Sequence, residues 1–260
     1  MQKPKFIYSF LCSCTGLALA IFMNTAQAEN LGKNYEFTNI QISAGEWPPF
    51  LSESLPNKGI IAHLISDIFN EAGIQVEFEF LPWVRAFEVT AQGEYSATSI
   101  WMYKKDRTTD FLYSEPVLSE KFVFFHLKDT PFDWNEMNDL RGKSIGGVLG
   151  YSYGPKFDAA LEEGVFKQLR LPTVDQNLRM LAAGRTDIYA EEMSVANYTL
   201  LKRTPELADL ITYHPKPILE NQSFLLFPKK GPNSKALLEI FNSHLEGFKQ
   251  DGRYDTYFTE

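Results

Sequence analysis

Hydrophobic residues along the chain follow two alternating patterns, one typical of β-strands and one typical of amphipathic helices. Residues 39–44 alternate between apolar and polar side chains and are rich in β-branched residues, which predicts a strand. In residues 59–72 the apolar positions recur three or four apart, which predicts a helix. Residues 75–81 alternate again, and helical spacing returns up to Gly93. This strand-helix order is typical of a mostly parallel sheet flanked by helices.

The pattern changes character in the middle of the chain. Residues 95–102 and 111–114 are strand-like, and residues 117–127 form a β-rich run long enough to carry the chain from one lobe towards another. Residues 128–141 are polar, acidic and turn-forming, so we interpret them as the start of a second unit. The elements predicted beyond are strands at 144–149, 187–190 and 223–227, helices at 156–162, 174–183, 195–201 and 235–248, and a proline-containing connector at 212–218.

Residues 45–50, GEWPPF, form a loop directly after the first predicted strand. Its two prolines exclude both a helix and a strand ladder, so the loop holds Trp47 and Phe50 stiffly at a strand end. These aromatic side chains could bind a ligand or simply plug the core. Both interpretations stay open.

A cationic turn lies within residues 99–116, where Lys104, Lys105 and Arg107 separate two apolar runs. A guanidinium binds both oxygens of a carboxylate at once and does not act as an acid or base, so this turn suits anion binding better than catalysis. We interpret Arg107 as the anion clamp of a binding protein. A solvated basic turn is the alternative.

Two further strand ends carry candidate chemistry. Residues 150–155, GYSYGP, form a strand-to-helix turn that offers free amide groups to an anion, or else a tight turn with Ser152 as a helix cap. Glu191 and Glu192 follow the strand at 187–190. Either one could be a general acid if its pKa were raised, or both could be helix-start charges that favour the dipole.

The first 28 residues read as a secretory signal peptide. Lys3 and Lys5 precede a mostly apolar run that ends in Ala26-Gln27-Ala28, a tripeptide of the type that signal peptidase cuts. An uncleaved membrane anchor is the rival interpretation, and no later stretch reaches the length of a membrane helix. We expect an exported mature chain that begins at Glu29.

Composition narrows the possible functions. Both cysteines lie in the predicted signal peptide, so the mature chain would have no thiol chemistry and no disulfide. Its formal charge becomes −10 instead of −8, because the removed segment holds two lysines and no acid. An acidic chain argues against nucleic acid and anionic lipid as partners. The four histidines show no paired ligand spacing, so we expect no metal site and no cofactor.

Several motifs, taken in order, resemble the periplasmic solute-binding proteins of ABC importers, in the polar amino acid group known as bacterial extracellular solute-binding protein family 3. The resemblance covers nearly the whole mature chain. It rests on GEWPPF, LPWVRAFEVTAQGEYSA, KKDRTTDFLYSEPV, RGKSIGGVLGYSYG, AAGRTDIYAEEMSVANY and LEGFKQDGRYDTYF.

The resemblance implies an α/β fold of type II, with two lobes that close on a ligand through two hinge crossings. The first lobe would comprise residues 29–127 and 221–260, and the second residues 128–220. Each lobe would hold a mixed, mostly parallel sheet flanked by helices. The implied partners are a small carboxylate-bearing ligand and an inner-membrane ABC permease, and we expect a monomer that is not an enzyme.

The resemblance also assigns roles to single residues. Arg107 matches the arginine that binds the ligand carboxylate, Trp47 and Trp83 match the aromatic sandwich, and Ser152 matches the second-lobe turn. Glu192 falls where the family usually has an aspartate that accepts the ligand's ammonium. The full set of candidate ligand-binding residues is Glu46, Trp47, Trp83, Trp101, Arg107, Tyr151, Ser152 and Glu192.

The chain departs from the family pattern at three positions. Ala44 replaces an acidic residue before the aromatic loop, for which Glu46 is a possible substitute, and Met102 and Lys104 replace small polar residues. These departures leave the identity of the ligand open. The same fold resembles periplasmic dehydratases and a lytic-enzyme module, so a dehydratase-like enzyme remains an alternative. A ligand-sensing subunit for a membrane receptor is another alternative, because no sequence feature separates transport from sensing.

Overall fold

The computed structural model describes residues 37–259. The predicted signal peptide and both cysteines therefore lie outside the described residues. Within residues 37–259, no helix has the length and apolar character needed to cross a bilayer.

The described strands form one mixed sheet with the order β2-β1-β3-β9-β4-β7-β5-β6, and β8 pairs with β4. The pairings β1–β2, β1–β3, β5–β6 and β5–β7 are parallel, whereas β4 and β9 run antiparallel to their neighbours. The strands are β1 (Asn39–Ala44), β2 (Gln75–Phe80), β3 (Ala97–Met102), β4 (Phe111–Leu127), β5 (Ser144–Val148), β6 (Lys167–Leu171), β7 (Ile188–Glu192), β8 (Ile211–Tyr213) and β9 (Leu219–Pro228).

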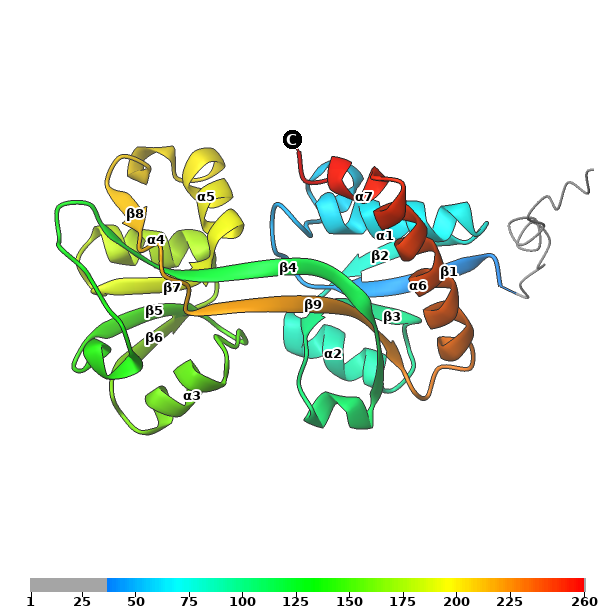
Figure 1. The fold of residues 1–260 in the computed structure, drawn as a ribbon, viewed down its shortest axis with the longest axis horizontal. Helices are drawn as coiled ribbons and strands as arrows, with labels where there is room; N and C mark the ends of the chain where they lie inside the picture. The colour runs from blue at the N-terminus through cyan, green and yellow to red at the C-terminus, as the bar shows by residue number, and fades with distance from the viewer. Residues whose placement is uncertain (1–36, 260) are drawn as a thin grey trace, which may run out of the picture. The chain divides into compact units, whose positions relative to one another are not determined.

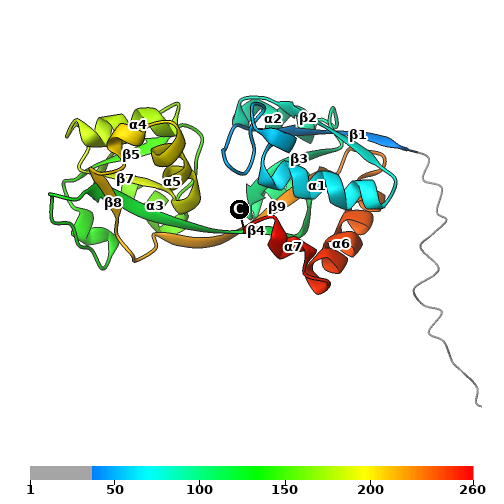
Figure 2. The ribbon, with the colours of Figure 1, turned by 90° about the horizontal axis from the view of Figure 1, so that it is seen from above.

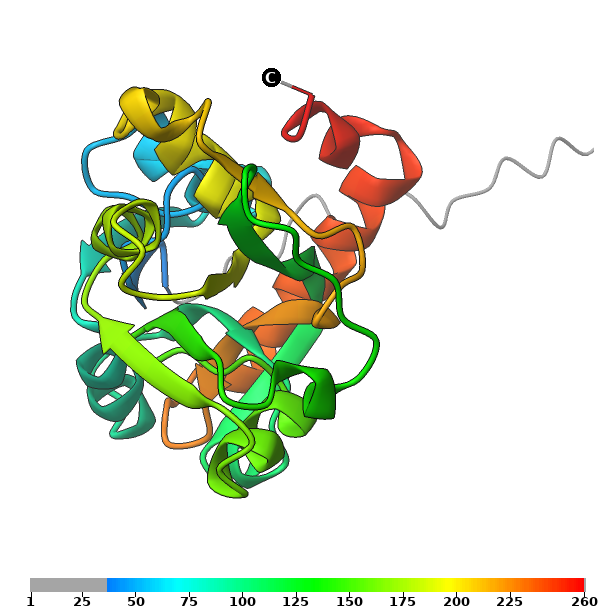
Figure 3. The same cartoon turned by 90° about the vertical axis from the view of Figure 1, so that its left-hand side faces the viewer.

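Helices pack on the sheet in both lobes, which the two long strands β4 and β9 connect. The first lobe carries α1 (Ile60–Glu71), α2 (Trp83–Ala91), α6 (Ser234–Gln250) and α7 (Arg253–Thr256), and the second carries α3 (Pro155–Glu162), α4 (Val174–Ala182) and α5 (Met193–Lys202). In the second lobe, α4 and α5 lie on one face of the sheet and α3 on the other (Figure 1, Figure 3). The two-lobed α/β fold of type II is confirmed.

The strands β4 and β9 run side by side between the lobes (Figure 1, Figure 2). The sequence suggested a break in β4, but the structure has one strand of 17 residues whose register with β9 shifts around Pro116. Proline lacks an amide hydrogen, so it locally disrupts the ladder without ending the strand. The two strands are the hinge crossings that the resemblance implies.

Each lobe has its own apolar core. In the first lobe, Phe69 of α1 meets Phe241 of α6 with ring centroids 5.4 Å apart, and both side chains are fully buried. In the second lobe, Leu178 and Leu181 of α4 pack against Tyr189 of β7 in a common buried cluster. These leucines occupy the helical spacing seen in the sequence, which explains why the sequence located the helices well.

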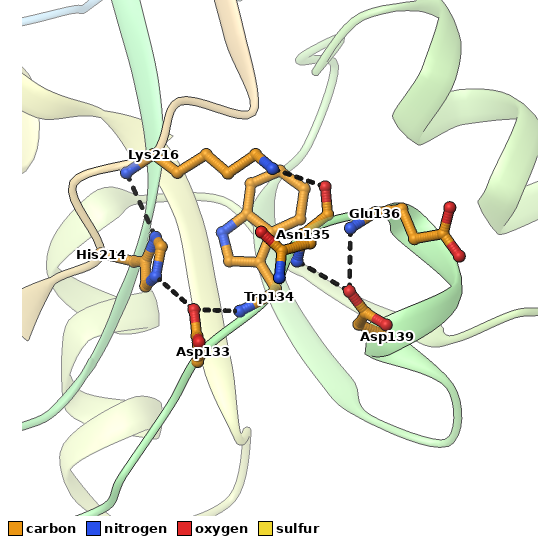
Figure 4. A network of polar contacts seen from close by, with 7 residues as sticks. All are labelled: Asp133, Trp134, Asn135, Glu136, Asp139, His214 and Lys216. Atoms are coloured by element: carbon orange, nitrogen blue, oxygen red, sulfur yellow. Dashed lines mark hydrogen bonds and ion pairs between the residues drawn. The ribbon is translucent and has the colours of Figure 1, made fainter.

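A polar network joins two segments of the second lobe (Figure 4). His214 Nε2 lies 3.0 Å from Asp133 Oδ1, and the Lys216 ammonium donates to the carbonyl of Asn135 at 2.6 Å. The indole of Trp134 packs beneath, with its ring centroid 5.2 Å from the Lys216 Nζ. The network thus ties the segment after β4 to the segment before β9.

Candidate ligand-binding cleft

A cavity lies where the two lobes and the hinge strands meet. It is lined by residues from β3, α2 and the loops of the first lobe, from β4 and β9, and from the turn after β5. These residues are Trp47, Trp83, Ile100, Trp101, Met102, Arg107, Glu120, Phe122, Gly150, Tyr151, Ser152 and Ser223. Parallel strands place their carboxyl ends at one edge of a sheet, which is where open α/β sheets bind ligands.

The loop after β1 holds Trp47 against the cavity. The Trp47 amide donates to the carbonyl of Leu51 at 2.6 Å, and the Leu51 amide donates back at 3.0 Å. The Phe50 ring packs on Trp47 with centroids 5.0 Å apart. Trp47 is 5% exposed, and its indole Nε1 has no hydrogen-bond partner among the described residues. A buried donor without a partner is costly, so this indole suits a ligand acceptor.

Trp83 forms a second aromatic wall at the first turn of α2. A Cβ on Gly45 would lie 2.3 Å from the Trp83 ring, so only glycine lets the indole approach this closely. Trp83 meets Trp101 edge-on at 5.1 Å between centroids. It also meets Tyr151 of the second lobe at 6.5 Å. Trp83 therefore forms an aromatic contact between the two lobes.

Arg107 lies on a short 3-10 helix, Asp106–Thr109, directly after β3. Its Nη1 donates to the carbonyl of Met102 at 2.9 Å, and its Cζ lies 4.8 Å from the centroid of the Trp101 ring. Burial lowers the pKa of the guanidinium. Among residues 37–259, no carboxylate lies within ion-pair distance of Arg107.

The second lobe contributes a turn between β5 and α3. The carbonyl of Tyr151 accepts a hydrogen bond from Arg170 Nη1 at 2.9 Å, which anchors the turn. The Ser152 hydroxyl donates to Asp158 Oδ2 at 3.1 Å. The helix N-cap is Gly154, so Ser152 does not cap α3 as one interpretation of the sequence had it.

Glu120 was missed by the sequence interpretation, although it lines the cavity. It lies on β4, is 5% exposed, and accepts from Asn221 Nδ2 at 3.3 Å. A signal for it existed in the sequence, because Leu118, Glu120 and Phe122 alternate along a β-rich run and so share one face of the strand. A charged residue at a position where such a run otherwise has apolar side chains is expected to be buried, and a buried charge marks a candidate functional residue.

Glu191 and Glu192 form a buried pair at the end of β7. The Tyr189 hydroxyl donates to Glu191, and the Glu192 amide donates to Glu191 Oε1 at 2.8 Å. Glu192 accepts from the amide of Val195 at 2.9 Å and thereby caps α5. Burial is the main cause that raises the pKa of Glu191 to about 8 and that of Glu192 to about 7.

The structure brings six of the predicted site residues to one cavity. These are Trp47, Trp83, Trp101, Arg107, Tyr151 and Ser152. Glu46 is exposed and accepts from the amide of Glu53 at 2.8 Å, and neither it nor Glu192 is among the described residues that line this cavity. The ligand-binding roles of all eight residues stay predictions.

The profile of the bacterial extracellular solute-binding proteins, family 3, matches residues 40–260. The chain belongs to this family. It is 27% identical over 263 residues to a "Probable histidine-binding protein" of Campylobacter jejuni subsp. jejuni, which covers 97% of this chain and 96% of the relative.

Solved structures share the fold of this family member. An ancestral arginine-binding protein bound to arginine has a TM-score of 0.71 at 20% identity, covering 86% of this chain and 98% of that one. A histidine kinase sensor domain with similarity to periplasmic binding proteins has a TM-score of 0.72 at 20% identity, covering 85% and 94%.

Within residues 37–259, no group of three or more histidine, cysteine, aspartate or glutamate side chains could hold a metal ion.

Proposed function

We propose that this protein captures a small carboxylate-bearing solute, an amino acid or a close analogue, between its lobes and delivers it to an inner-membrane ABC permease. The observation that carries the proposal is Arg107, whose guanidinium lines the cavity and has no carboxylate partner among the described residues. A partly buried cation of this kind is stabilised when an anion enters beside it.

Two neighbours support a carboxylate at this end of the cavity. The carbonyl of Met102 and the ring of Trp101 fix the guanidinium, so less side-chain freedom is lost when a ligand binds. Trp47 lines the same cavity, and its Nε1 has no hydrogen-bond partner among the described residues. The indoles of Trp83 and Trp101 would contact the body of the solute.

The hinge supports capture by closure. Of the strands within residues 37–259, only β4 and β9 run between the lobes as long strands, so a small change in their backbone would open the cleft. We propose that residues 29–127 and 221–260 move as one lobe and residues 128–220 as the other. We also propose that the mature protein is a monomer in the periplasm after removal of residues 1–28.

The relatives support an amino acid as the solute. One is named a probable histidine-binding protein, and a solved structure with this fold holds arginine. Both of these solutes combine a carboxylate with an amine. Arg107 would bind the carboxylate, and Glu192 remains the residue that the family resemblance assigns to the amine.

A thermal-shift screen of residues 29–260 against amino acids, peptides, polyamines and organic acids would find the solute class, because a ligand that binds the native state raises the melting temperature. Arg107→Ala should weaken the binding of carboxylate solutes by about 3 kcal/mol. Calorimetric titration measures this loss. The exposed neighbour variant Lys105→Ala is the matched control and should bind as the wild type does. Equal affinity for Arg107→Ala would contradict the proposal.

A dehydratase-like enzyme is the second candidate, favoured by the pKa of Glu192, which burial raises to about 7. A carboxyl group that titrates near neutral pH is suited to general acid catalysis. Its side chain, however, caps α5 and is not among the described residues that line the cavity. Loss of a cyclic carboxylic acid on incubation with the protein, abolished by Glu192→Gln, would establish this alternative.

A further inference from the structure

The hinge strand β4 places one acidic side chain in the cleft. Side chains alternate across a strand, so Leu118, Glu120 and Phe122 lie on one face and Lys121 points to the other. The burial pattern agrees, since the three are buried whereas Lys121 is only partly so. Lys121 forms no ion pair with its neighbour Glu120.

The partners of Glu120 carry no charge. Its carboxylate accepts from Asn221 Nδ2 at 3.3 Å and from the hydroxyl of Ser223. No lysine, arginine or histidine of the described chain lies within ion-pair distance. Burial accordingly raises the pKa of Glu120. A buried carboxylate that faces only neutral partners and a cavity is stabilised by any cation that enters the cavity.

Arg107 and Glu120 line the same cavity without pairing with each other. The cavity therefore presents one cationic and one anionic group, each free to meet a ligand group of opposite charge. The walls near the hinge include Phe122 and Tyr151, and aromatic rings also favour cations.

The roles that the family resemblance assigns do not include Glu120. If Glu192 accepts the ligand's α-ammonium, the carboxylate on the hinge is a second anionic group. Glu120 and Arg107 both line the cavity, and neither forms an ion pair with another described residue. This arrangement favours a solute that carries a second cationic group besides its α-ammonium.

We propose that Glu120 is a specificity residue, which selects amino acids that carry a cationic side chain by pairing with that side chain's guanidinium, ammonium or imidazolium. This inference rests on the proposed function and deepens it by naming the solute class. The α-carboxylate stays at Arg107 and the second cation reaches the hinge.

L-Arginine and L-citrulline provide the sharpest test, because they share their α-groups and shape and differ only in a charged guanidinium against a neutral urea. Wild-type protein titrated in a calorimeter should bind arginine about tenfold or more tightly than citrulline. In Glu120→Gln, which keeps the size of the side chain, arginine affinity should fall to that of citrulline, whose own affinity stays unchanged.

Glu192→Gln is the matched variant. It should weaken arginine and citrulline by the same factor, because both carry the α-ammonium. Unchanged citrulline binding by Glu120→Gln also shows that this variant is folded, which a melting curve would check independently.

Three outcomes would overturn the inference. Equal binding of arginine and citrulline by the wild type would show that Glu120 does not select charge, and the proposed capture of amino acids would still stand. A preference for arginine that survives in Glu120→Gln would place the selecting group elsewhere. If no amino acid and no other small carboxylate-bearing solute binds the wild type, the proposed function falls together with this inference.

Discussion

The two charged sides of the cleft are built in opposite ways. On the first lobe, the Arg107 guanidinium stacks on Trp101 and donates to a backbone carbonyl, and its charge is permanent. On the side of the hinge and second lobe, Glu120, Glu191 and Glu192 are buried without a cation among the described residues, and burial raises all three pKa values. The comparison teaches that the charge of Arg107, and so its ability to bind an anion, does not depend on pH. The charge of the three buried glutamates does change with pH or with a bound ligand.

The largest predicted effect is a change in the free energy of unfolding with pH, caused by the buried carboxylates of the second lobe. The pKa of Glu191 is raised from its ordinary value of 4.5 to about 8, so the folded protein holds a proton that the unfolded chain releases. Its stabilising contribution is complete below about pH 4.5 and is lost as the pH rises through about 8. The loss is on the order of 5 kcal/mol as an upper limit.

Denaturant unfolding of the ligand-free protein between pH 5 and pH 9 measures this loss, and Glu191→Gln should abolish most of it. The exposed variant Glu206→Gln is the control and should keep the slope of the wild type, since the pKa of Glu206 is lowered rather than raised. A flat profile for the wild type would mean that Glu191 is not desolvated.

The second-largest effect should come from the Trp83 ring, which lines the cavity together with Arg107. Gly45→Ala places a Cβ against the Trp83 ring, and such overpacking costs about 1–3 kcal/mol in stability. The displaced indole should also weaken solute binding in a titration. Gly247→Ala serves as control, because a Cβ at this helical position meets nothing within 4 Å. Wild-type behaviour of Gly45→Ala would refute the close contact.

A smaller loss should follow from Trp101→Leu, which removes the ring beneath the guanidinium. Cation–π contacts contribute about 0.5–2 kcal/mol, and binding of a carboxylate solute should weaken by that amount. Calorimetry checks it, with Tyr103→Leu as an exposed neighbour that should change nothing. A loss as large as that of Arg107→Ala would mean that Trp101 contacts the solute as its main anchor.

The smallest effect should come from an exposed carboxylate. The hydrogen bond with His214 lowers the pKa of Asp133, the reverse of what burial does to Glu191 (Figure 4). Solvent and salt screen such a pair, so Asp133→Asn should shift the melting temperature little and leave solute binding unchanged. A large destabilisation would show that the network carries more of the second lobe than its exposure suggests.

The sequence predicted most elements because their apolar spacing is regular. The predicted strand at 39–44 coincides with β1, and the helix at 174–183 ends one residue beyond α4. The strands β6 and β8 were missed. Lys167–Leu171 carries charged residues at two of five positions, and Ile211–Tyr213 is too short to show a period.

The candidate site was only partly predictable. Trp47, Trp83 and Arg107 follow strands at one edge of the sheet, and sequence order alone reveals that placement. Glu120 lies inside a long strand, and only the pairing of β4 with β9 shows that its face looks into the cleft. The sequence likewise did not show that Glu192 turns its carboxylate to the amides of α5.

The most direct test is a calorimetric comparison of L-arginine and L-histidine with agmatine and histamine, the amines that lack only their carboxylates. The account predicts that the wild type binds at least one of the amino acids and binds its decarboxylated amine about a hundredfold more weakly, because Arg107 then has no partner. Equal or tighter binding of the amine would contradict it.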